Sequence, residues 1–350
     1  MKRIISLLMV ALLIMGSMAG CTGNQETAPE APADNESAET EQISEETETT
    51  EEPVASQDVM IAGLMGPTSM GMIKLFEEKA LNSDAYSVEY MAESAPEALV
   101  GKIINGDVQI AAVPTNLASV LYNKTEGAVQ FLALNTLGVI HIVGSAEISS
   151  LEDLKGQTLY VSGQGATPDY AINYILEKAG LKDDIAIEFY PDHASLAQAV
   201  IAGDAPAAVL PQPFVTQVVM KSENVNLLID LNEAWSEATD NAGDLAMGCL
   251  LVNREFAENN KEFISEFMVQ YEASVNWVNE NPAEAGLLIE SNGILPNAKL
   301  AETAIPKCAI VFKTAQEAKD EINTFLEILM NFNPSSIGGK LPDEDFYYSE

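Results

Sequence analysis

The chain repeats one order of strands and helices, and this repetition is its strongest constraint on the fold. The order is strand, glycine-containing turn, helix, strand, helix, Gly-Asp turn, strand and proline-containing loop, first over 58–116 and again over 158–213. Alternation of strands and helices is typical of a parallel sheet covered by helices. The sequence therefore predicts an α/β protein with two similar lobes.

A direct overlay of the two copies supports a structural repeat. Residues 96–117 placed on 193–214 without a gap give six identities in 22 positions. They include Gly106-Asp107 on Gly203-Asp204 and Pro114 on Pro211. Agreement in both element order and turn residues favours two related units. The alternative is a chance match, since generic α/β turns share residue types.

Two apolar segments are the candidates for the connections between the lobes. One is a strand pair within 128–143, and the other is a strand at 246–252. Beyond 252 the pattern is mostly helical, and these helices are expected to return to the first lobe. The predicted domains are therefore 58–143 plus 246–350 for the first lobe and 144–245 for the second.

The N-terminus has the layout of a bacterial lipoprotein signal. Two basic residues precede an uncharged, mostly apolar stretch over 4–19, which is too short for a comfortable membrane span. The stretch ends in Met18-Ala19-Gly20-Cys21, which resembles a lipobox. We expect residues 1–20 to be removed and Cys21 to carry the lipid that anchors the chain to the extracytoplasmic face of the cell membrane. An ordinary secretory peptide with an incidental Cys is the alternative.

Residues 21–57 are expected to form an acidic, disordered tether after the lipidated Cys. Positions 22–57 hold 11 acidic residues, no Lys or Arg and few large apolar side chains, so they cannot bury a core. Self-repelling charge favours an extended segment that holds a folded domain away from the membrane. The whole chain carries a net charge of −36 with scattered lysines, which argues against a nucleic-acid partner.

Several motifs together resemble those of ABC-transporter solute-binding lipoproteins. They are the lipobox and tether, GPTSMG at 66–71, AAVPTN at 111–116, SLEDLKG at 150–156 and GQGATP at 163–168. The most similar group is the nitrate/sulfonate/bicarbonate, or SsuA/THI5-like, family, and the resemblance covers about 58–335. It implies a type II periplasmic-binding fold, in which two lobes joined by two hinge strands close over one small solute.

Polar or glycine-containing loops follow four of the expected strands. Open parallel sheets bind ligands at these carboxyl ends, where helix N-termini present free N–H groups. Helix capping or turn formation is the alternative role for each residue. Asn135 and Thr136, where the first connecting strand is expected to begin, are further candidates. The predicted solute contacts on the four loops are Thr68, Ser69, Pro114, Thr115, Gly165, Ala166, Thr167 and Gln212.

The sequence contains no recognisable catalytic or metal-binding set. His141 and His193 have no Cys or HExxH-like partner, and no GxxxxGK[ST] or GxGxxG motif occurs. Cys249 and Cys308 are expected to be small buried hydrophobes, with a disulfide between them as the alternative. Trp235 is expected to pack between helices, or else to stack on a planar ligand. We therefore predict a protein that is not an enzyme and holds no metal or cofactor.

The scarcity of arginine narrows the class of solute. Arg254 is the only arginine after the signal, and it lies just past the second connection. A bidentate arginine clamp on a sulfonate or phosphonate is therefore not expected. The predicted solute is neutral or zwitterionic, or is an anion held by helix N-termini and hydroxyls alone.

The predicted function is capture of a small solute for an ABC importer. Its implied partners are the solute, the permease and ATPase subunits, and the membrane through the lipid anchor, and the chain is expected to be a monomer. Two other functions stay open. One is a ligand-sensing lipoprotein of the same fold, and the other is a secreted enzyme of the THI5-like type.

Overall fold

The computed structural model describes residues 56–145 and 147–349 of the 350-residue chain. The predicted signal peptide 1–20, the lipidated Cys21 and the tether up to residue 55 lie outside the described residues. The first strand begins at Gln57, one residue before the predicted strand. Both copies of the repeated strand and helix order are present.

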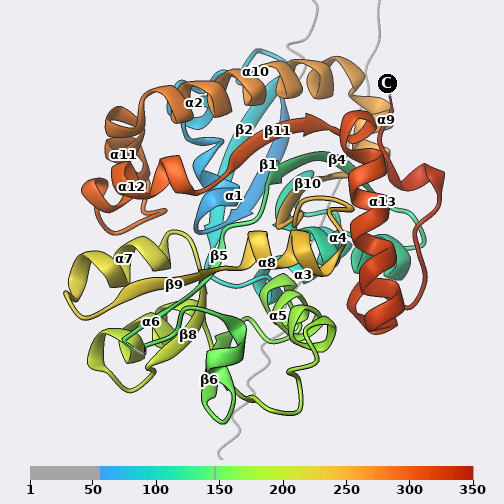
Figure 1. The fold of residues 1–350 in the computed structure, drawn as a ribbon. Coiled ribbons are helices and arrows are strands. Elements are labelled where there is room, and N and C mark those ends of the chain that lie inside the picture. The colour runs from blue at the N-terminus through green and yellow to red at the C-terminus, as the bar shows by residue number, and fades with distance from the viewer. Residues whose placement is uncertain (1–55, 146, 350) are drawn as a thin grey trace, which may run out of the picture. The chain divides into compact units, whose positions relative to one another are not determined.

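The first sheet has six strands in the order β11-β4-β10-β3-β1-β2 (Figure 1). In this sheet β1 is parallel to β2 and β3, whereas β10 is antiparallel to β3 and β4. β11 joins the edge antiparallel to β4. The strands are β1 (Gln57–Leu64), β2 (Tyr86–Glu93), β3 (Ile110–Pro114), β4 (Val129–Thr136), β10 (Gly248–Asn253) and β11 (Ile310–Thr314).

The second sheet repeats this plan in the order β7-β6-β8-β5-β9. Here β6 is parallel to β7 and β8, and β5 is antiparallel to β8 and β9. The prediction of two similar α/β lobes is therefore confirmed. The strands are β5 (Ile140–Gly144), β6 (Thr158–Ser162), β7 (Ala186–Tyr190), β8 (Ala207–Pro211) and β9 (Asn226–Asp230). We call each sheet with its covering helices lobe 1 and lobe 2.

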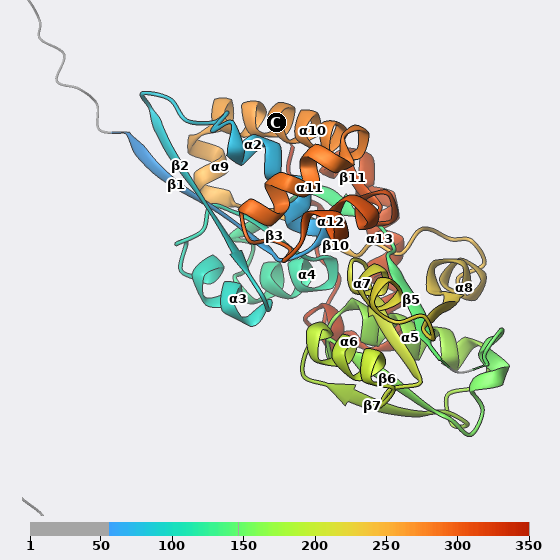
Figure 2. The same cartoon turned by 90° about the vertical axis from the view of Figure 1, so that its left-hand side faces the viewer.

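Helices cover both faces of each sheet, which explains why β3, β5 and β8 are apolar along almost their whole length. On one face of the first sheet, α2 and α9 to α12 bury a core. On the other face, α3, α4 and α13 enclose a core that continues beneath α5 and α8 of lobe 2. The remaining face of the second sheet is covered by α6 and α7 (Figure 2).

The helix bounds follow the sequence pattern closely where the apolar spacing is regular. Four short 3-10 helices, η1 to η4, lie at Leu151–Leu154, Ile305–Lys307, Pro334–Ile337 and Glu344–Phe346. The α-helices are α1 (Pro67–Met70), α2 (Ile73–Glu77), α3 (Glu97–Ile104), α4 (Thr115–Lys124), α5 (Thr167–Lys178), α6 (His193–Ala202), α7 (Phe214–Lys221), α8 (Leu231–Ala238), α9 (Arg254–Asn259), α10 (Lys261–Glu280), α11 (Pro282–Ser291), α12 (Ala298–Ala304) and α13 (Ala315–Phe332).

The chain crosses between the sheets twice. The first crossing is the short segment 137–139 between β4 and β5, and the second lies between α8 and β10, over 239–247. β5 pairs in the second sheet, although the expected boundary after Val143 assigns most of it to the first lobe. The apolar pattern of 128–143 indicates two strands but carries no information about which sheet each one joins.

Trp235 packs between helices, as the sequence favoured. Its side chain is 1% exposed and contacts Tyr174 of α5 and Phe325 of α13. Because α13 also packs on β4 and β11 of lobe 1, the indole is part of the contact between the lobes. A stacking role on a ligand is not available to a side chain buried in this way.

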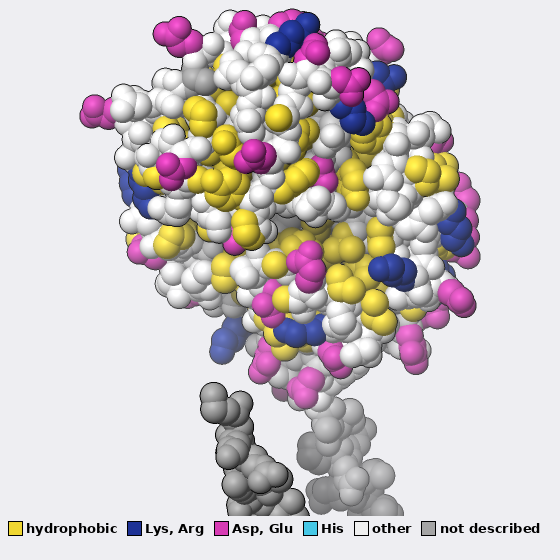
Figure 3. Space-filling model, turned by 90° about the horizontal axis from the view of Figure 1, so that it is seen from below, with side chains coloured by type: hydrophobic (Ala, Val, Ile, Leu, Met, Phe, Trp, Pro, Cys, Tyr) yellow, Lys and Arg dark blue, Asp and Glu magenta, His cyan; other side chains and the backbone are white. Residues whose placement is uncertain are grey.

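The largest departures from the predicted pattern are short elements. The hydrophobic pattern predicts no element between Pro213 and Ala246, where the structure has α7, β9 and α8. Among the residues described, no helix combines the length and apolar content that a membrane span needs. Figure 3 shows acidic side chains spread over the face seen from below, with basic side chains fewer and scattered. No basic surface for nucleic acid is visible on that face.

Candidate functional site

The carboxyl ends of the parallel strands in the two lobes face one another. β1 and β3 lead into α1 and α4 in lobe 1, and β6 and β8 lead into α5 and α7 in lobe 2. Across the boundary, the hydroxyl of Thr167 donates to Oδ1 of Asn116 at 3.2 Å. A Cβ added to Gly66 would lie 3.9 Å from Cδ of Pro213. The lobes are therefore in contact along these edges, as in a closed arrangement.

The hydroxyls of Thr68 and Ser69 are engaged at the start of α1. Both donate to the carbonyl oxygen of Leu64, at 3.1 Å and 2.5 Å, and Ser69 is fully buried. A Cβ added to Gly248 would lie 2.7 Å from Cγ2 of Thr68, so Thr68 also packs closely on β10. The two hydroxyls stabilise the turn and keep only acceptor capacity for another group.

Asn135 and Thr136 end β4 and do not begin a connecting strand. Both are buried. Asn135 donates through Nδ2 to the carbonyl oxygen of Thr68 at 3.5 Å and accepts through Oδ1 from the Thr136 hydroxyl at 3.1 Å. The structure therefore brings these two residues together with the loop after β1, where they hold the end of β4 against α1.

Pro114 and Thr115 lie at the junction of β3 and α4. Pro114 is the last residue of the strand, and Thr115 is buried beside the thiol of Cys249. Burial raises the pKa of the Cys249 thiol, and it raises the pKa of Cys308 to about 12. Both cysteines are buried and free, so they are inert apolar groups and the alternative of a disulfide is wrong.

The loop after β6 is held largely by its own contacts. Gly165 has a φ of 78°, which favours glycine, and its N–H donates to the Asp169 carboxylate at 2.9 Å. Ala166 is half-buried just before α5, whereas Thr167 is buried and reaches Asn116 of lobe 1. Of these three predicted residues, Thr167 is the one that joins the lobes.

A serine–histidine contact supports the same loop. Oγ of Ser162, at the end of β6, lies 2.6 Å from Nδ1 of His193, at the start of α6. Burial lowers the pKa of His193 to about 4, so the imidazole is neutral at pH 7. The neighbouring Asp192 carboxylate accepts from Ser195, and Ser162 is fully buried. The pair is therefore placed to hold the loop and lacks the exposed hydroxyl of a nucleophile.

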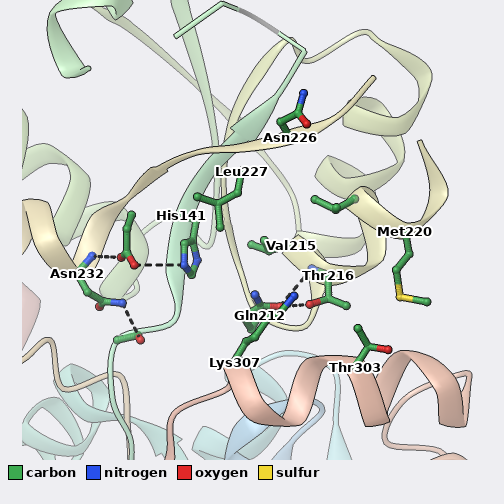
Figure 4. A pocket seen from close by; sticks show the side chains of 13 residues that line it. His141, Gln212, Val215, Thr216, Met220, Asn226, Leu227, Asn232, Thr303 and Lys307 are labelled. Atoms are coloured by element: carbon green, nitrogen blue, oxygen red, sulfur yellow. Dashed lines mark hydrogen bonds and ion pairs between the residues drawn. The ribbon is translucent and has the colours of Figure 1, made fainter. Parts of the chain in front are cut away.

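A cavity of about 600 Å³ lies where lobe 2 meets α12 and η2 of lobe 1 (Figure 4). This volume is typical of sites for small organic ligands. Of the residues predicted as solute contacts, Gln212 is the one that lines it. The lining residues are Gly138, His141, Gln212, Val215, Thr216, Val219, Met220, Asn226, Leu227, Asp230, Asn232, Thr303 and Lys307.

The polar groups of the cavity hold one another in fixed orientations. Oε1 of Gln212 accepts from the N–H of Thr216 at 3.2 Å and from its hydroxyl at 2.8 Å. Nδ2 of Asn232 donates to the carbonyl oxygen of Gly138 at 2.8 Å. Such fixed side chains can discriminate between hydrogen-bond donors and acceptors on a ligand.

His141 and Asp230 lie together in the same cavity. Nε2 of His141 is 3.7 Å from Oδ2 of Asp230. Burial lowers the pKa of His141 and outweighs the opposite effect of Asp230, so the imidazole is neutral at pH 7. His141 is thus a buried strand residue, as expected, and it is also a cavity residue, which the sequence did not indicate.

Most of the cavity lining could not be recognised from the sequence. Asp230 is the last residue of β9 and Asn232 lies just beyond it, and the residues of this strand show no regular alternation. Recognition of Asn226–Asp230 as a strand would have added this fifth carboxyl-end loop to the four predicted ones. Lys307 and Thr303 come from lobe 1 through α12 and η2, and no motif marks them.

Arg254 is remote from this site. It follows β10, which runs antiparallel to β3, so Arg254 and Pro114 lie at opposite ends of these two strands. Its Nε donates to the carbonyl oxygen of Gly127 at 2.6 Å, and its Nη2 donates to that of Asp345 at 2.9 Å. The guanidinium therefore ties the C-terminal segment to lobe 1. In the described part of the chain, no group of three or more His, Cys, Asp or Glu side chains is placed to hold a metal ion.

Two sheets with one strand order, joined by two crossings and facing at their carboxyl ends, define a fold of the periplasmic-binding-protein type. A solved structure of an ABC transporter from Parabacteroides distasonis is similar, with 25% identity, a TM-score of 0.72, and coverage of 83% of this chain and 99% of that one. The periplasmic aliphatic sulphonate binding protein SsuA from Escherichia coli has 16% identity, a TM-score of 0.67 and coverage of 83% and 92%. The ligand-binding component of an ABC-type import system from Staphylococcus aureus has 14% identity, a TM-score of 0.62, and coverage of 83% of this chain and 98% of that one.

The family model described as NMT1/THI5 like matches residues 86–285. The match spans more than half of the chain, and the chain belongs to this family. A comparison with curated proteins gives no match.

Proposed function

We propose that the protein is an extracytoplasmic solute-binding lipoprotein of an ABC importer. Residues 1–20 serve as its signal, Cys21 carries the lipid, and the acidic segment after it acts as a tether. The two lobes capture one small organic solute or oxyanion and present it to the permease, which an ATPase subunit drives. The protein acts as a monomer and does not transform its solute.

One observation carries this proposal. A 600 Å³ cavity lies at the boundary of two lobes whose carboxyl-end loops face one another, and polar groups from both lobes line it. Gln212 and Asn232 follow strands of lobe 2, whereas Lys307 belongs to lobe 1. A solute bound there would contact both lobes and stabilise their closed arrangement, which is the state that a permease can recognise.

The similar structures support the same role. The protein from Staphylococcus aureus is described as part of an import system, and SsuA as a periplasmic sulphonate-binding protein. The site chemistry agrees with binding alone, because Ser162 is fully buried and the Asp192 carboxylate next to His193 accepts from Ser195.

Thermal unfolding of the full chain in detergent tests solute capture. The panel contains sulfonates, nitrate, amino acids, thiamine pyrimidines and flavins, and compounds recovered from the purified protein by mass spectrometry are added to it. A solute at 100 times its Kd adds about 2.7 kcal/mol to the free energy of unfolding, which raises Tm by several degrees.

The matched variants are Gln212→Ala and Gln217→Ala, of which only the first changes the cavity. We expect the first to abolish the shift and the second to keep it. Recovery of a chemically altered compound would contradict pure binding, and a panel without any shift or recovered compound would contradict solute capture. Lipidation is tested separately by the mass of the chain, since Cys21→Ala should remove the added lipid.

A further inference from the structure

Two amides that line the cavity are held by hydrogen bonds in opposite senses. Oε1 of Gln212 is taken by Thr216, so Nε2 with its two hydrogens is the group left for a ligand. Nδ2 of Asn232 is taken by the carbonyl of Gly138, and its Oδ1 is buried without a hydrogen-bond partner among the described residues. These hydrogen bonds fix Gln212 as a donor and Asn232 as an acceptor.

His141 lies beside Asn232 at the same end of the cavity. Its Nε2 is 3.7 Å from the Asp230 carboxylate, and the Val139 carbonyl beside the imidazole raises its pKa against the larger effect of burial. Nδ1 is buried without a hydrogen-bond partner in the described part of the chain. His141 as a whole is only 9% exposed. The unpaired Oδ1 of Asn232 and the Asp230 carboxylate make this end of the cavity negative and short of hydrogen-bond donors.

The other end of the cavity is positive. Lys307 reaches it from η2 of lobe 1, and the ion pairs found among the described residues do not include this lysine. With Gln212, it offers only hydrogen-bond donors. Figure 4 shows Asn232 and His141 towards one side and Gln212, Lys307 and Thr303 towards the other. The cavity therefore has an acceptor end in lobe 2 and a donor end that lobe 1 completes.

Apolar side chains line the remaining wall. Val219 and Met220 of α7 and Leu227 of β9 are 42%, 49% and 49% exposed, which makes them three of the nine exposed large hydrophobic residues in the described structure. Their gathering at one cavity indicates a ligand with an apolar segment that covers them.

We propose that the cavity binds a zwitterionic organic solute whose cationic donor group and anionic acceptor group are separated by an apolar segment. The cation faces Asp230, Asn232 and His141, the anion faces Lys307 and Gln212, and the apolar segment lies on α7 and β9. This inference rests on the proposed function and names the class of its solute. A simple anion would leave the acceptors unpaired, and a simple cation would leave Lys307 unpaired, so either is disfavoured.

The ω-amino acids with four to ten carbons are the probes that test this class. Each is compared with the monocarboxylate and the monoamine of the same length, by calorimetry on the full chain in detergent at up to 10 mM ligand. We expect at least one ω-amino acid to bind about tenfold or more tightly than either single-ended compound, because each end gains a charge-assisted hydrogen bond.

Variants that remove one charge test which residue binds each charged group of the solute. Lys307→Gln and Asp230→Asn should each weaken binding of the amino acid about tenfold to a hundredfold. The controls are Lys299→Gln on α12 and Glu233→Gln on α8, which change the same charges outside the cavity and should leave the affinity unchanged.

Two outcomes overturn the inference. They are equal affinity for the monocarboxylate, and no binding by any ω-amino acid. In each case, recovery of some other small molecule from the purified protein keeps the proposed function and rejects only the solute class. If nothing is recovered and no panel compound binds, the proposed function fails as well.

Discussion

Gly138→Ala should destabilise the protein because the Asn232 side chain occupies the space of the missing Cβ. A Cβ built on Gly138 would lie 1.4 Å from Oδ1 of Asn232, 2.3 Å from its Cγ and 3.0 Å from its Nδ2. The backbone of Gly138 does not require glycine, since its φ lies outside the left-handed region. Alanine therefore forces the Asn232 amide out of its place, and the hydrogen bond to the Gly138 carbonyl is lost.

The expected magnitude is the difference of two effects. Loss of the hydrogen bond and exposure of its buried partners cost about 1–3 kcal/mol. Reduced entropy of the unfolded chain on a Gly→Ala change returns about 0.4–1 kcal/mol. We expect a net loss of about 1–2 kcal/mol in the free energy of unfolding, and weaker solute binding because Asn232 lines the cavity.

The double variant Gly138→Ala/Asn232→Ala tests whether the Asn232 side chain causes the destabilisation. In Asn232→Ala the three obstructing atoms are gone, and no other atom lies nearer than 3.0 Å, so only the entropic gain of Gly138→Ala should remain. The same substitution is thus expected to destabilise the natural chain and to stabilise the Asn232→Ala chain by about 0.4–1 kcal/mol. Urea unfolding followed by tryptophan fluorescence measures all four proteins. Equal effects of Gly138→Ala in both backgrounds would refute the steric account.

Three other substitutions each test one contact described above. Thr167→Val removes the hydrogen bond to Asn116, which should cost about 0.5–1.5 kcal/mol and raise the solution radius of gyration; an unchanged radius would mean that this bond does not hold the lobes closed. His193→Gln should flatten the pH dependence of stability between about pH 6.5 and 4. The native pKa of about 4 lies below the unfolded value, so the unfolded chain binds more protons there and stability falls by up to about 1.4 kcal/mol per pH unit as pH drops. An equal slope in both proteins would place this titration elsewhere. Arg254→Gln should lower stability by about 1 kcal/mol and leave solute affinity unchanged, and loss of affinity would contradict its remote position.

The fold was largely predictable because the same order of strands, helices and turns occurs twice in the sequence. Gly106-Asp107 and Gly203-Asp204 end α3 and α6 at equivalent places in the two lobes, and each is followed by a buried strand. Outside the repeat, regular apolar spacing identifies α10 and α13. β9 and β11 were missed because each is a five-residue edge strand with half-exposed side chains, which leaves no alternation to read.

The predicted site residues illustrate how one residue type serves two purposes. Ser, Thr and Gly at carboxyl-end loops stabilise helix starts as readily as they bind ligands. In the structure Thr68, Ser69 and Gly165 direct their donor groups to neighbouring groups of their own lobe. Gln212 differs because Thr216 takes only its oxygen and leaves its nitrogen towards the cavity.

The chemical asymmetry of the cavity arises from pairs that are distant in sequence. The contact that fixes Asn232 as an acceptor joins residues 94 positions apart, and Lys307 reaches the cavity only after the chain has crossed back to lobe 1. Neither the contact of Asn232 nor the position of Lys307 can be recognised from the pattern of residues along the chain. Because Lys307 of the donor end belongs to lobe 1 and the acceptor end to lobe 2, a solute with both charges gains its full set of contacts only when the lobes are together. Binding of a zwitterionic solute and closure of the lobes are therefore coupled. A substitution at either end of the cavity is expected to weaken both binding and closure.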